Sequence, residues 1–177
     1  MIAKINLIRD DENFQNMMLG DLMKDLIEEN QGCDIIPGSE GDFGLSSSNP
    51  IPVNGPIGQL AYLSKLRTLN GERIFFHRLG SVENATDVFE AVTFSGSKWF
   101  KLYLKMYYPR RSRKAPEGFT LHDGPSSFTG FTHYCENFPL DFVKTKEANS
   151  GNGLNIAYAP ISLVQPHLER GSFDRPA

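Results

Sequence analysis

An alternation of basic and aromatic side chains is the feature of this sequence that most directly predicts chemistry. It runs through Trp99, Lys101, Tyr103, Lys105 and Tyr107, and the basic run RRSRK begins three residues later. Residues two apart in a strand lie on the same face of a sheet, so these side chains would form one stripe. Proteins hold single-stranded nucleic acids with cations that meet phosphates and rings that stack on bases. The pattern therefore predicts a surface that binds an anionic partner.

We assign ten residues to this candidate binding surface, because two neighbouring hairpins would bring their basic and aromatic side chains to one face. They are Lys65, Arg67, Arg78, Trp99, Lys101, Tyr103, Lys105, Tyr107, Arg110 and Arg111. The same composition is also typical of the solvated outer face of an antiparallel sheet. Exposed aromatic residues on such a face would equally suit a protein partner or a homodimer. Nucleic acid or another polyanion, a protein partner and a second copy of the chain remain alternatives.

A second group of residues suggests an enzyme instead. Cys135 lies two residues after His133, and a thiol beside a histidine base can act as a nucleophile. His77, within an apolar stretch, could serve as a buried base. The alternative function is thus a small hydrolase- or transferase-like enzyme with a pocket near His77, His133 and Cys135. A buried inert thiol and a hydrogen-bonded core histidine explain these residues without catalysis, so the sequence favours a non-enzymatic binding protein.

The motifs of metal and nucleotide sites are missing from the sequence. The pair His133 and Cys135 lacks the spacing of zinc ligands such as C-x2-C or H-x3-H, and no second pair accompanies it. Neither a phosphate-binding G-x-x-x-x-G-K-[ST] loop nor a G-x-G-x-x-G or G-x-S-x-G motif occurs. We therefore expect no metal and no cofactor.

Length and composition fit one globular domain spanning residues 1–177. The chain is 40% hydrophobic and 22% charged, which are ordinary values, and it is long enough to bury a core. Its net charge is −3, but residues 65–114 carry eleven basic and four acidic side chains, whereas residues 1–45 carry three basic and ten acidic. Positive charge is therefore concentrated around the candidate binding surface.

Features of secreted and membrane proteins are also missing. The N-terminus has no apolar signal core, and no run reaches about 18 apolar residues. Cys33 and Cys135 are too few for a disulfide framework. We expect a cytoplasmic protein that does not engage a membrane.

Four segments would position the candidate residues. Residues 11–30 repeat apolar side chains every four positions, which predicts one amphipathic helix. Residues 33–57 are rich in Pro and Gly and predict a long loop. Residues 58–108 predict two β-hairpins, with turns at Asn70-Gly71 and Gly96-Ser97, and residues 109–177 are irregular.

These elements predict an α+β fold: a four- to five-stranded antiparallel β-meander with the N-terminal helix packed on one face. In the second hairpin, a two-residue loop pairs Thr93 with Phe100 and Ala91 with Leu102. Phe100, Leu102 and Leu104 then face the core.

Several strings between residues 49 and 118 resemble a family of small uncharacterised bacterial proteins. They are NPIPVNGPIG at 49–58, YLS at 62–64, FHRLG at 76–80 and YPRRSRKAP at 108–116. The resemblance implies no activity and no functional residues. It suggests only that the prolyl loop, His77-Arg78 and the basic run form one neighbourhood.

Overall fold

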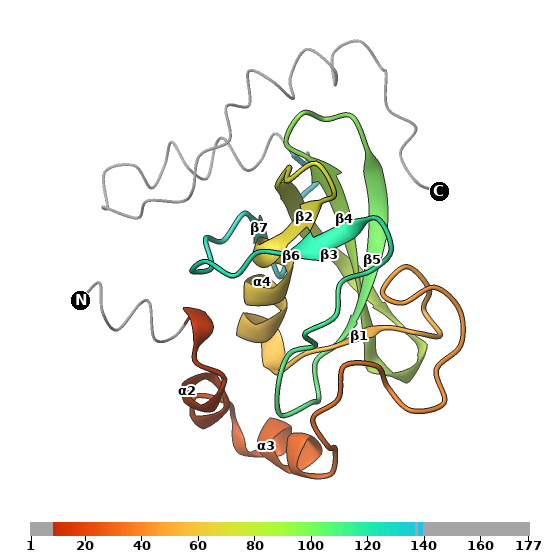
Figure 1. The fold of residues 1–177 in the computed structure, drawn as a ribbon. Coiled ribbons are helices and arrows are strands. Elements are labelled where there is room, and N and C mark those ends of the chain that lie inside the picture. Colours follow the sequence, from red (N-terminus) through yellow and green to blue (C-terminus); the bar gives the residue numbers. More distant parts are fainter. Residues whose placement is uncertain (1–8, 137, 140–177) are drawn as a thin grey trace, which may run out of the picture.

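The computed structural model of the chain describes residues 9–136 and 138–139 (Figure 1). Its helices are α2 (Glu12–Met17), α3 (Asp21–Glu28) and α4 (Gly55–Lys65), and a 3-10 turn spans Glu83–Ala85. Its strands are β1 (Ile51–Pro52), β2 (Leu66–Thr68), β3 (Ile74–Val82), β4 (Thr86–Thr93), β5 (Trp99–Lys105), β6 (Phe119–Leu121) and β7 (Gly130–Phe131). Within these ranges, no helix has the length and apolar character needed to cross a bilayer.

The main sheet has five strands in the order β1-β5-β4-β3-β7. Strands β3, β4 and β5 form the predicted antiparallel meander. The two edge strands run parallel to their neighbours, β1 beside β5 and β7 beside β3. A second sheet pairs β2 with β6. The α+β class is confirmed, but a purely antiparallel meander is not, because distant segments add the edges.

The β4–β5 hairpin keeps the predicted faces but not the predicted register. Val92 pairs with Trp99 and Ala91 with Phe100, so each partner is displaced by two residues. The loop contains five residues, 94–98, and the Thr93 amide donates to the Lys98 carbonyl at 3.0 Å. Side chains alternate with a period of two, so a displacement of two leaves every residue on its predicted face.

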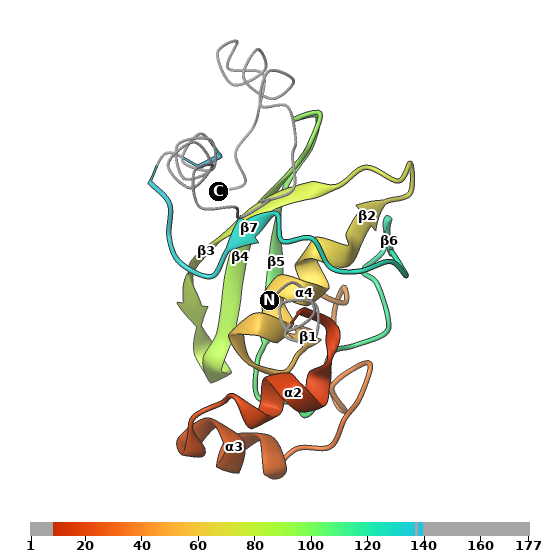
Figure 2. The same cartoon turned by 90° about the vertical axis from the view of Figure 1, so that its left-hand side faces the viewer.

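The first predicted hairpin is found only beside its turn, where Arg67 bridges Arg73 in antiparallel orientation, and the rest of its first strand is wrong because residues 55–65 form α4. Pro56 occupies the first turn of this helix, where a missing amide hydrogen costs nothing. Seven of its residues are buried, so it lacks the single apolar stripe by which helices are recognised in sequences. The helix lies against one face of the sheet (Figure 2). There Tyr62 and Leu63 join Phe76, Phe89 and Leu102 in the main core.

The expected single N-terminal helix is not confirmed. Asp11 caps α2 by accepting the Phe14 amide hydrogen at 2.9 Å, but α2 ends at Met17, and Gly20 is the N-cap of a separate helix, α3. Both short helices lie at one end of the molecule, beside the start of α4 rather than on the sheet (Figures 1 and 2). Leu19 contacts Gly55 closely, since a Cβ on Gly55 would lie 2.8 Å from it. The face predicted for the N-terminal helix is occupied by α4.

The remaining predicted segments are found in part. Residues 33–50 contain no helix or strand, as expected of the prolyl and glycyl loop, but the predicted loop to residue 57 is too long because β1 and the start of α4 lie within it. The segment after residue 109 contains β6 and β7. The rest of the predicted irregular C-terminal segment, residues 140–177, lies outside the described residues.

Candidate anion-binding site

The ten residues of the candidate binding surface do not share one face. Trp99, Lys101, Tyr103 and Lys105 alternate along β5 as predicted. Arg78 lies on β3, Lys65 ends α4, Arg67 lies on β2, and Tyr107, Arg110 and Arg111 follow β5. The structure therefore separates the predicted stripe on β5 from the basic residues that flank it in sequence.

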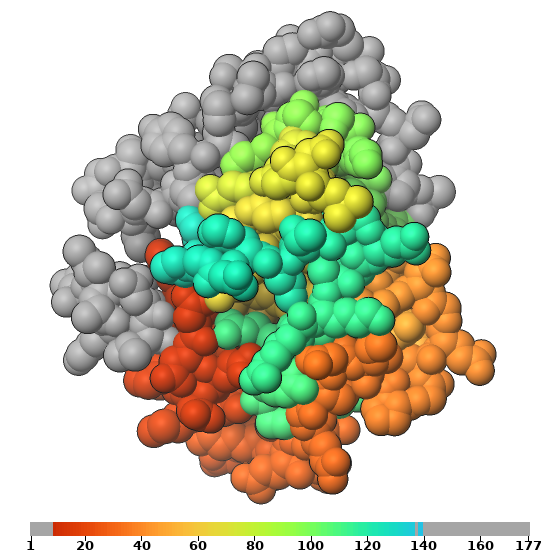
Figure 3. All heavy atoms as spheres, in the orientation of Figure 1, coloured from red at the N-terminus to blue at the C-terminus, as the bar shows by residue number. Residues whose placement is uncertain are grey.

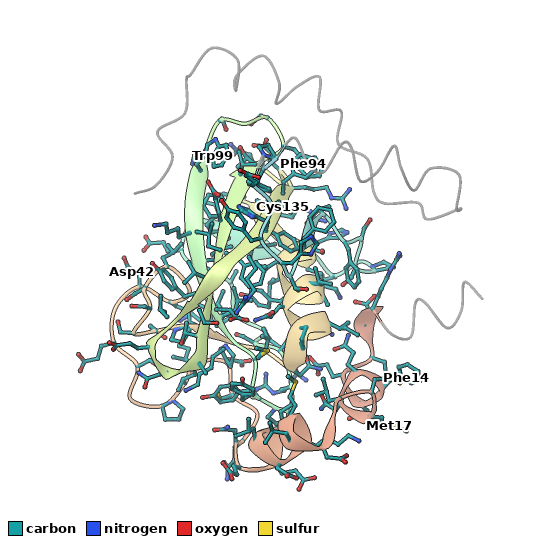
Figure 4. The ribbon with its side chains drawn as sticks, turned by 180° about the vertical axis from the view of Figure 1, so that it is seen from behind. Phe14, Met17, Asp42, Phe94, Trp99 and Cys135 are labelled. Atoms are coloured by element: carbon teal, nitrogen blue, oxygen red, sulfur yellow. The ribbon has the colours of Figure 1, made fainter. Side chains whose placement is uncertain are left out.

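Aromatic residues at one end of the outer sheet face pack within the chain. Phe75 and Val92 form a second apolar cluster with Cys135 and Phe138, and Trp99 packs against it. The Trp99 and Phe138 rings meet edge to face, with their centroids 5.8 Å apart. Figure 4 shows Phe94, Trp99 and Cys135 close together at this end of the sheet. Cys135 and Phe138 cover this part of the sheet face, which is therefore a small core.

His77 lies in the same layer and is fully hydrogen-bonded. Its Nε2 atom is 2.7 Å from Oε2 of Glu90, and its Nδ1 atom accepts the Cys135 amide hydrogen at 3.0 Å. Because an amide can only donate, Nδ1 carries no hydrogen, and Nε2 donates to the carboxylate. The Phe138 ring stacks on the imidazole at a centroid distance of 4.2 Å.

The contacts of His77 decide whether it could act as a base for the Cys135 thiol, as the alternative enzyme would require. His77 meets Cys135 through the main-chain amide, and both of its ring nitrogens are already engaged, so neither can take a proton from the thiol. The Cys135 thiol lies 4.0 Å from the His133 carbonyl oxygen. The His133 ring packs against Phe131, with centroids 5.1 Å apart. The three residues are near one another, but His77 and Cys135 have the contacts of a folded core, and His133 is exposed.

The described residues contain a different concave site, which we call the charged cavity. Its volume is about 420 Å³, and it is lined by Asp10, Glu12, Tyr62, Lys65, Arg111, Ser112, Arg113, Leu121, His122 and Asp123. It includes two residues of the candidate binding surface, Lys65 and Arg111. The others come from segments that are far apart in sequence.

Four segments meet at the charged cavity, residues 10–12, 62–65, 111–113 and 121–123. Strand β2 continues directly from α4 and pairs with β6, and this pairing brings residues 121–123 beside Lys65. The His122 amide donates to the Lys65 carbonyl at 2.9 Å. The basic run crosses the surface between this sheet and the N-terminal helices (Figure 3). Sequence alone does not reveal this pairing, because β2 and β6 are far apart along the chain.

Two of the four basic side chains in the cavity are held by acidic ones. The Lys65 ammonium lies 3.0 Å from Asp10, and Arg111 Nε lies 3.2 Å from Glu12. Arg111 also donates to the main-chain carbonyls of Arg9 and Asp10, at 3.3 and 2.8 Å. These bonds fix the walls of the cavity.

Asp10 connects the cavity wall to the segment before β7. It accepts hydrogen bonds from the Ser126 amide at 3.0 Å and the Ser126 hydroxyl at 2.8 Å. Burial raises the pKa of Asp10, but the Ser126 bonds and Lys65 outweigh burial and hold the pKa below its ordinary value. The Asp10 carboxylate is therefore stabilised in its charged form.

The beginning of the basic run is anchored in the same way. Arg110 forms an ion pair with Asp34 at 2.7 Å, and the Arg113 amide donates to the same carboxylate at 2.9 Å. The Arg110 bond and the Arg113 amide lower the pKa of Asp34. The predicted binding residue Arg110 thus has a partner within the chain.

Two basic groups of the charged cavity remain available to a ligand. Within the part of the chain that the structure describes, the Arg113 guanidinium and the His122 ring form no hydrogen bond or ion pair, and both residues are exposed. His122 Nε2 lies close to Gly124, where a Cβ would come within 2.5 Å of it. A guanidinium and an imidazole that converge on one cavity can bind a carboxylate or phosphate group.

Comparison with known proteins assigns no family to this site. Residues 9–136 and 138–139 contain no group of three or more His, Cys, Asp or Glu residues that could hold a metal ion. Comparisons with models of protein families, with curated proteins and with solved structures find no match to the chain.

Proposed function

We propose that the protein binds a small molecule carrying a carboxylate or phosphate group in the charged cavity. The observation that carries the proposal is the pair of unengaged basic groups, Arg113 and His122, above walls already fixed by Asp10 and Glu12. Lys65 and Arg111 are held in place before the ligand arrives, so binding has to order only the side chains of Arg113 and His122.

The charge balance of the cavity favours a small ligand over a long polyanion. Three carboxylates, from Asp10, Glu12 and Asp123, line it together with the basic groups. A nucleic acid strand carries a phosphate at every nucleotide and would bring several of them near these carboxylates. A compact ligand can place one anionic group at Arg113 and keep the rest of its surface away from them.

Asp123, in the lining of the charged cavity, could pair with a cationic group of the ligand. Its side chain is exposed and forms no hydrogen bond or ion pair with any described residue. A ligand with an ammonium group could pair with Asp123 while its carboxylate meets Arg113. An amino acid such as glutamate is therefore a sharper probe than phosphate alone.

The test is calorimetric titration of the protein with inorganic phosphate, succinate and glutamate at low salt. We expect saturable binding of at least one of them, weakened about tenfold or more by Arg113→Gln, since a charge-assisted hydrogen bond contributes about 1.5–3 kcal/mol. Lys98→Gln is the matched control, because Lys98 is exposed in the β4–β5 loop and lies outside the cavity lining.

A second variant tests the position of His122 without removing it. Gly124→Ala places a methyl group 2.5 Å from His122 Nε2, so the exposed ring must rotate away. We expect weaker binding with an unchanged circular dichroism spectrum. Absence of saturable binding for all three probes, or equal affinities for wild type and Arg113→Gln, would contradict the proposal.

A further inference from the structure

A second candidate surface, on helices α2 and α3, is apolar rather than charged. Three large apolar side chains are exposed where α2 meets α3: Met17 at 74%, Met18 at 64% and Leu22 at 78%. Figure 4 shows Phe14 and Met17 on the outer side of α2. Single exposed apolar residues are ordinary on a surface, but three within six positions are not.

An apolar groove adjoins these residues. Its volume is about 360 Å³, and its lining combines Met17, Leu19, Ile27 and Pro109 with the polar Asn16, Lys24, Glu28 and Asn30. Two bonds fix its floor, since Asn16 donates to the Pro109 carbonyl at 2.8 Å and Asn30 to the Tyr107 carbonyl at 3.0 Å. Methionine side chains adapt to differently shaped apolar partners. We name this groove, with Met18 and Leu22, the methionine surface.

The charge around the methionine surface is strongly acidic. Helix α3 and its C-cap contain four exposed acidic residues, Asp21, Asp25, Glu28 and Glu29. The single basic residue of α3, Lys24, lies 3.9 Å from Asp21. Asp25, Glu28 and Glu29 form no side-chain hydrogen bond or ion pair with the residues that the structure describes. An apolar groove with an acidic rim complements a segment that is apolar on one side and basic on the other.

We propose that the methionine surface docks a basic amphipathic helix of a partner protein. Apolar side chains one turn apart would enter the groove between Met17 and Ile27, and flanking Lys or Arg side chains would pair with Glu28 and its neighbours. A two-fold contact with a second copy is disfavoured, because it would bring two acidic rims together. An anionic membrane would be repelled for the same reason.

The test uses a labelled model helix, two repeats of LKKLLKL, and its matched acidic peptide with Glu in place of every Lys. Fluorescence anisotropy is expected to show saturable binding of the basic peptide and at least about tenfold weaker binding of the acidic one. The triple variant Met17→Ser, Met18→Ser, Leu22→Ser is expected to weaken the basic peptide about tenfold. Leu69→Ser is the control, since Leu69 is equally exposed at 71% but lies between β2 and β3.

Several results would overturn this inference. Equal binding of both peptides, or equal affinity of the wild type and the triple variant, would show that the surface does not select a basic helix. A wild-type dimer in light scattering that the triple variant converts to a monomer would assign the surface to a second copy of the chain. Binding to phosphatidylcholine vesicles that the triple variant abolishes would assign it to lipid. None of these results depends on the charged cavity.

Discussion

His77 joins two strands of the main sheet to the segment that covers their outer face. Its imidazole is almost completely buried and uses both nitrogens, one toward Glu90 on β4 and one toward the Cys135 amide. Phe138 stacks on its free side. A buried polar side chain with every bond satisfied adds little net stability, but removing it leaves its partners without theirs. The role that the contacts support for His77 is structural.

Replacing His77 by leucine should therefore destabilise the fold strongly. The Cys135 amide would lose its acceptor and the Glu90 carboxylate would lose a donor, and each loss costs about 1–3 kcal/mol in a buried site. We expect the free energy of unfolding in urea to fall by roughly 2–4 kcal/mol.

His133→Gln is the matched control for that variant. His133 is exposed, and its ring contact is with Phe131 alone among the described residues. We expect a change within about 0.5 kcal/mol, as for most surface substitutions. A mild effect of His77→Leu, or equal effects of the two variants, would argue against the structural role.

At the scale of elements, the main sheet consists of a meander of consecutive strands, β3 to β5, and two edge strands, β1 and β7, from distant parts of the chain. Strands β3, β4 and β5 follow one another closely, so short loops bring them together. Strand β7 lies more than fifty positions after β3 in the sequence. The two strands pair Phe76 with Gly130 and His77 with Phe131. The approach is close, because a Cβ on Gly130 would lie 2.2 Å from the Phe76 carbonyl oxygen.

Gly130→Ala should consequently disrupt the β3–β7 edge. The clash involves a main-chain atom that cannot rotate away, so the edge must separate, and we expect a loss of about 2 kcal/mol or more in chemical denaturation. Gly20→Ala is the comparison, since nothing lies within 4 Å of its added Cβ. Its cost should stay below about 1 kcal/mol, the difference between Gly and Ala at a helix N-cap. Similar costs for both variants would refute the close approach.

At the scale of the whole molecule, ion pairs tie the acidic N-terminal segment to the basic run. Glu12 binds Arg111 and Asp34 binds Arg110, while Asp10 binds Lys65 at the end of α4. The acidic and basic segments of the sequence thus form ion pairs with each other within the fold. Much of the positive charge that predicted an anionic partner is neutralised by the chain itself.

The pH dependence of stability should report on Asp10. Its pKa in the folded protein lies below the ordinary value of about 3.9. A lowered pKa gives stability that is present above the unfolded pKa and disappears as the pH falls through the folded one. We expect Asp10→Asn to cost about 1 kcal/mol near neutral pH, a value reduced for partial exposure, and the difference from wild type to shrink below about pH 4.

The measurement is urea denaturation of both proteins between about pH 3 and pH 8. Asp42→Asn provides the control, because Asp42 is exposed and its carboxylate forms no hydrogen bond or ion pair with a described residue. Its difference from wild type should stay near zero at every pH. A constant difference for Asp10→Asn across the range would contradict the lowered pKa.

Features that depend on neighbours in sequence were predictable. The alternation along β5 determined which side chains face the core. The predicted faces of β4 and β5 are correct although the predicted register is wrong, because side chains in a strand alternate with a period of two and the register is displaced by two residues. The Pro- and Gly-rich composition likewise predicted the irregular segment 33–50, whereas the break at Gly20 was not predicted.

Features that depend on long-range contacts were decided by the tertiary structure. Helix α4 is buried on most of its surface, so its residues show no helical stripe and resemble a strand. The charged cavity requires β2 to meet β6 and Glu12 to meet Arg111 across 99 positions. The sequence contains the charges, but only the tertiary contacts between these distant segments determine which of them are paired and which face a ligand.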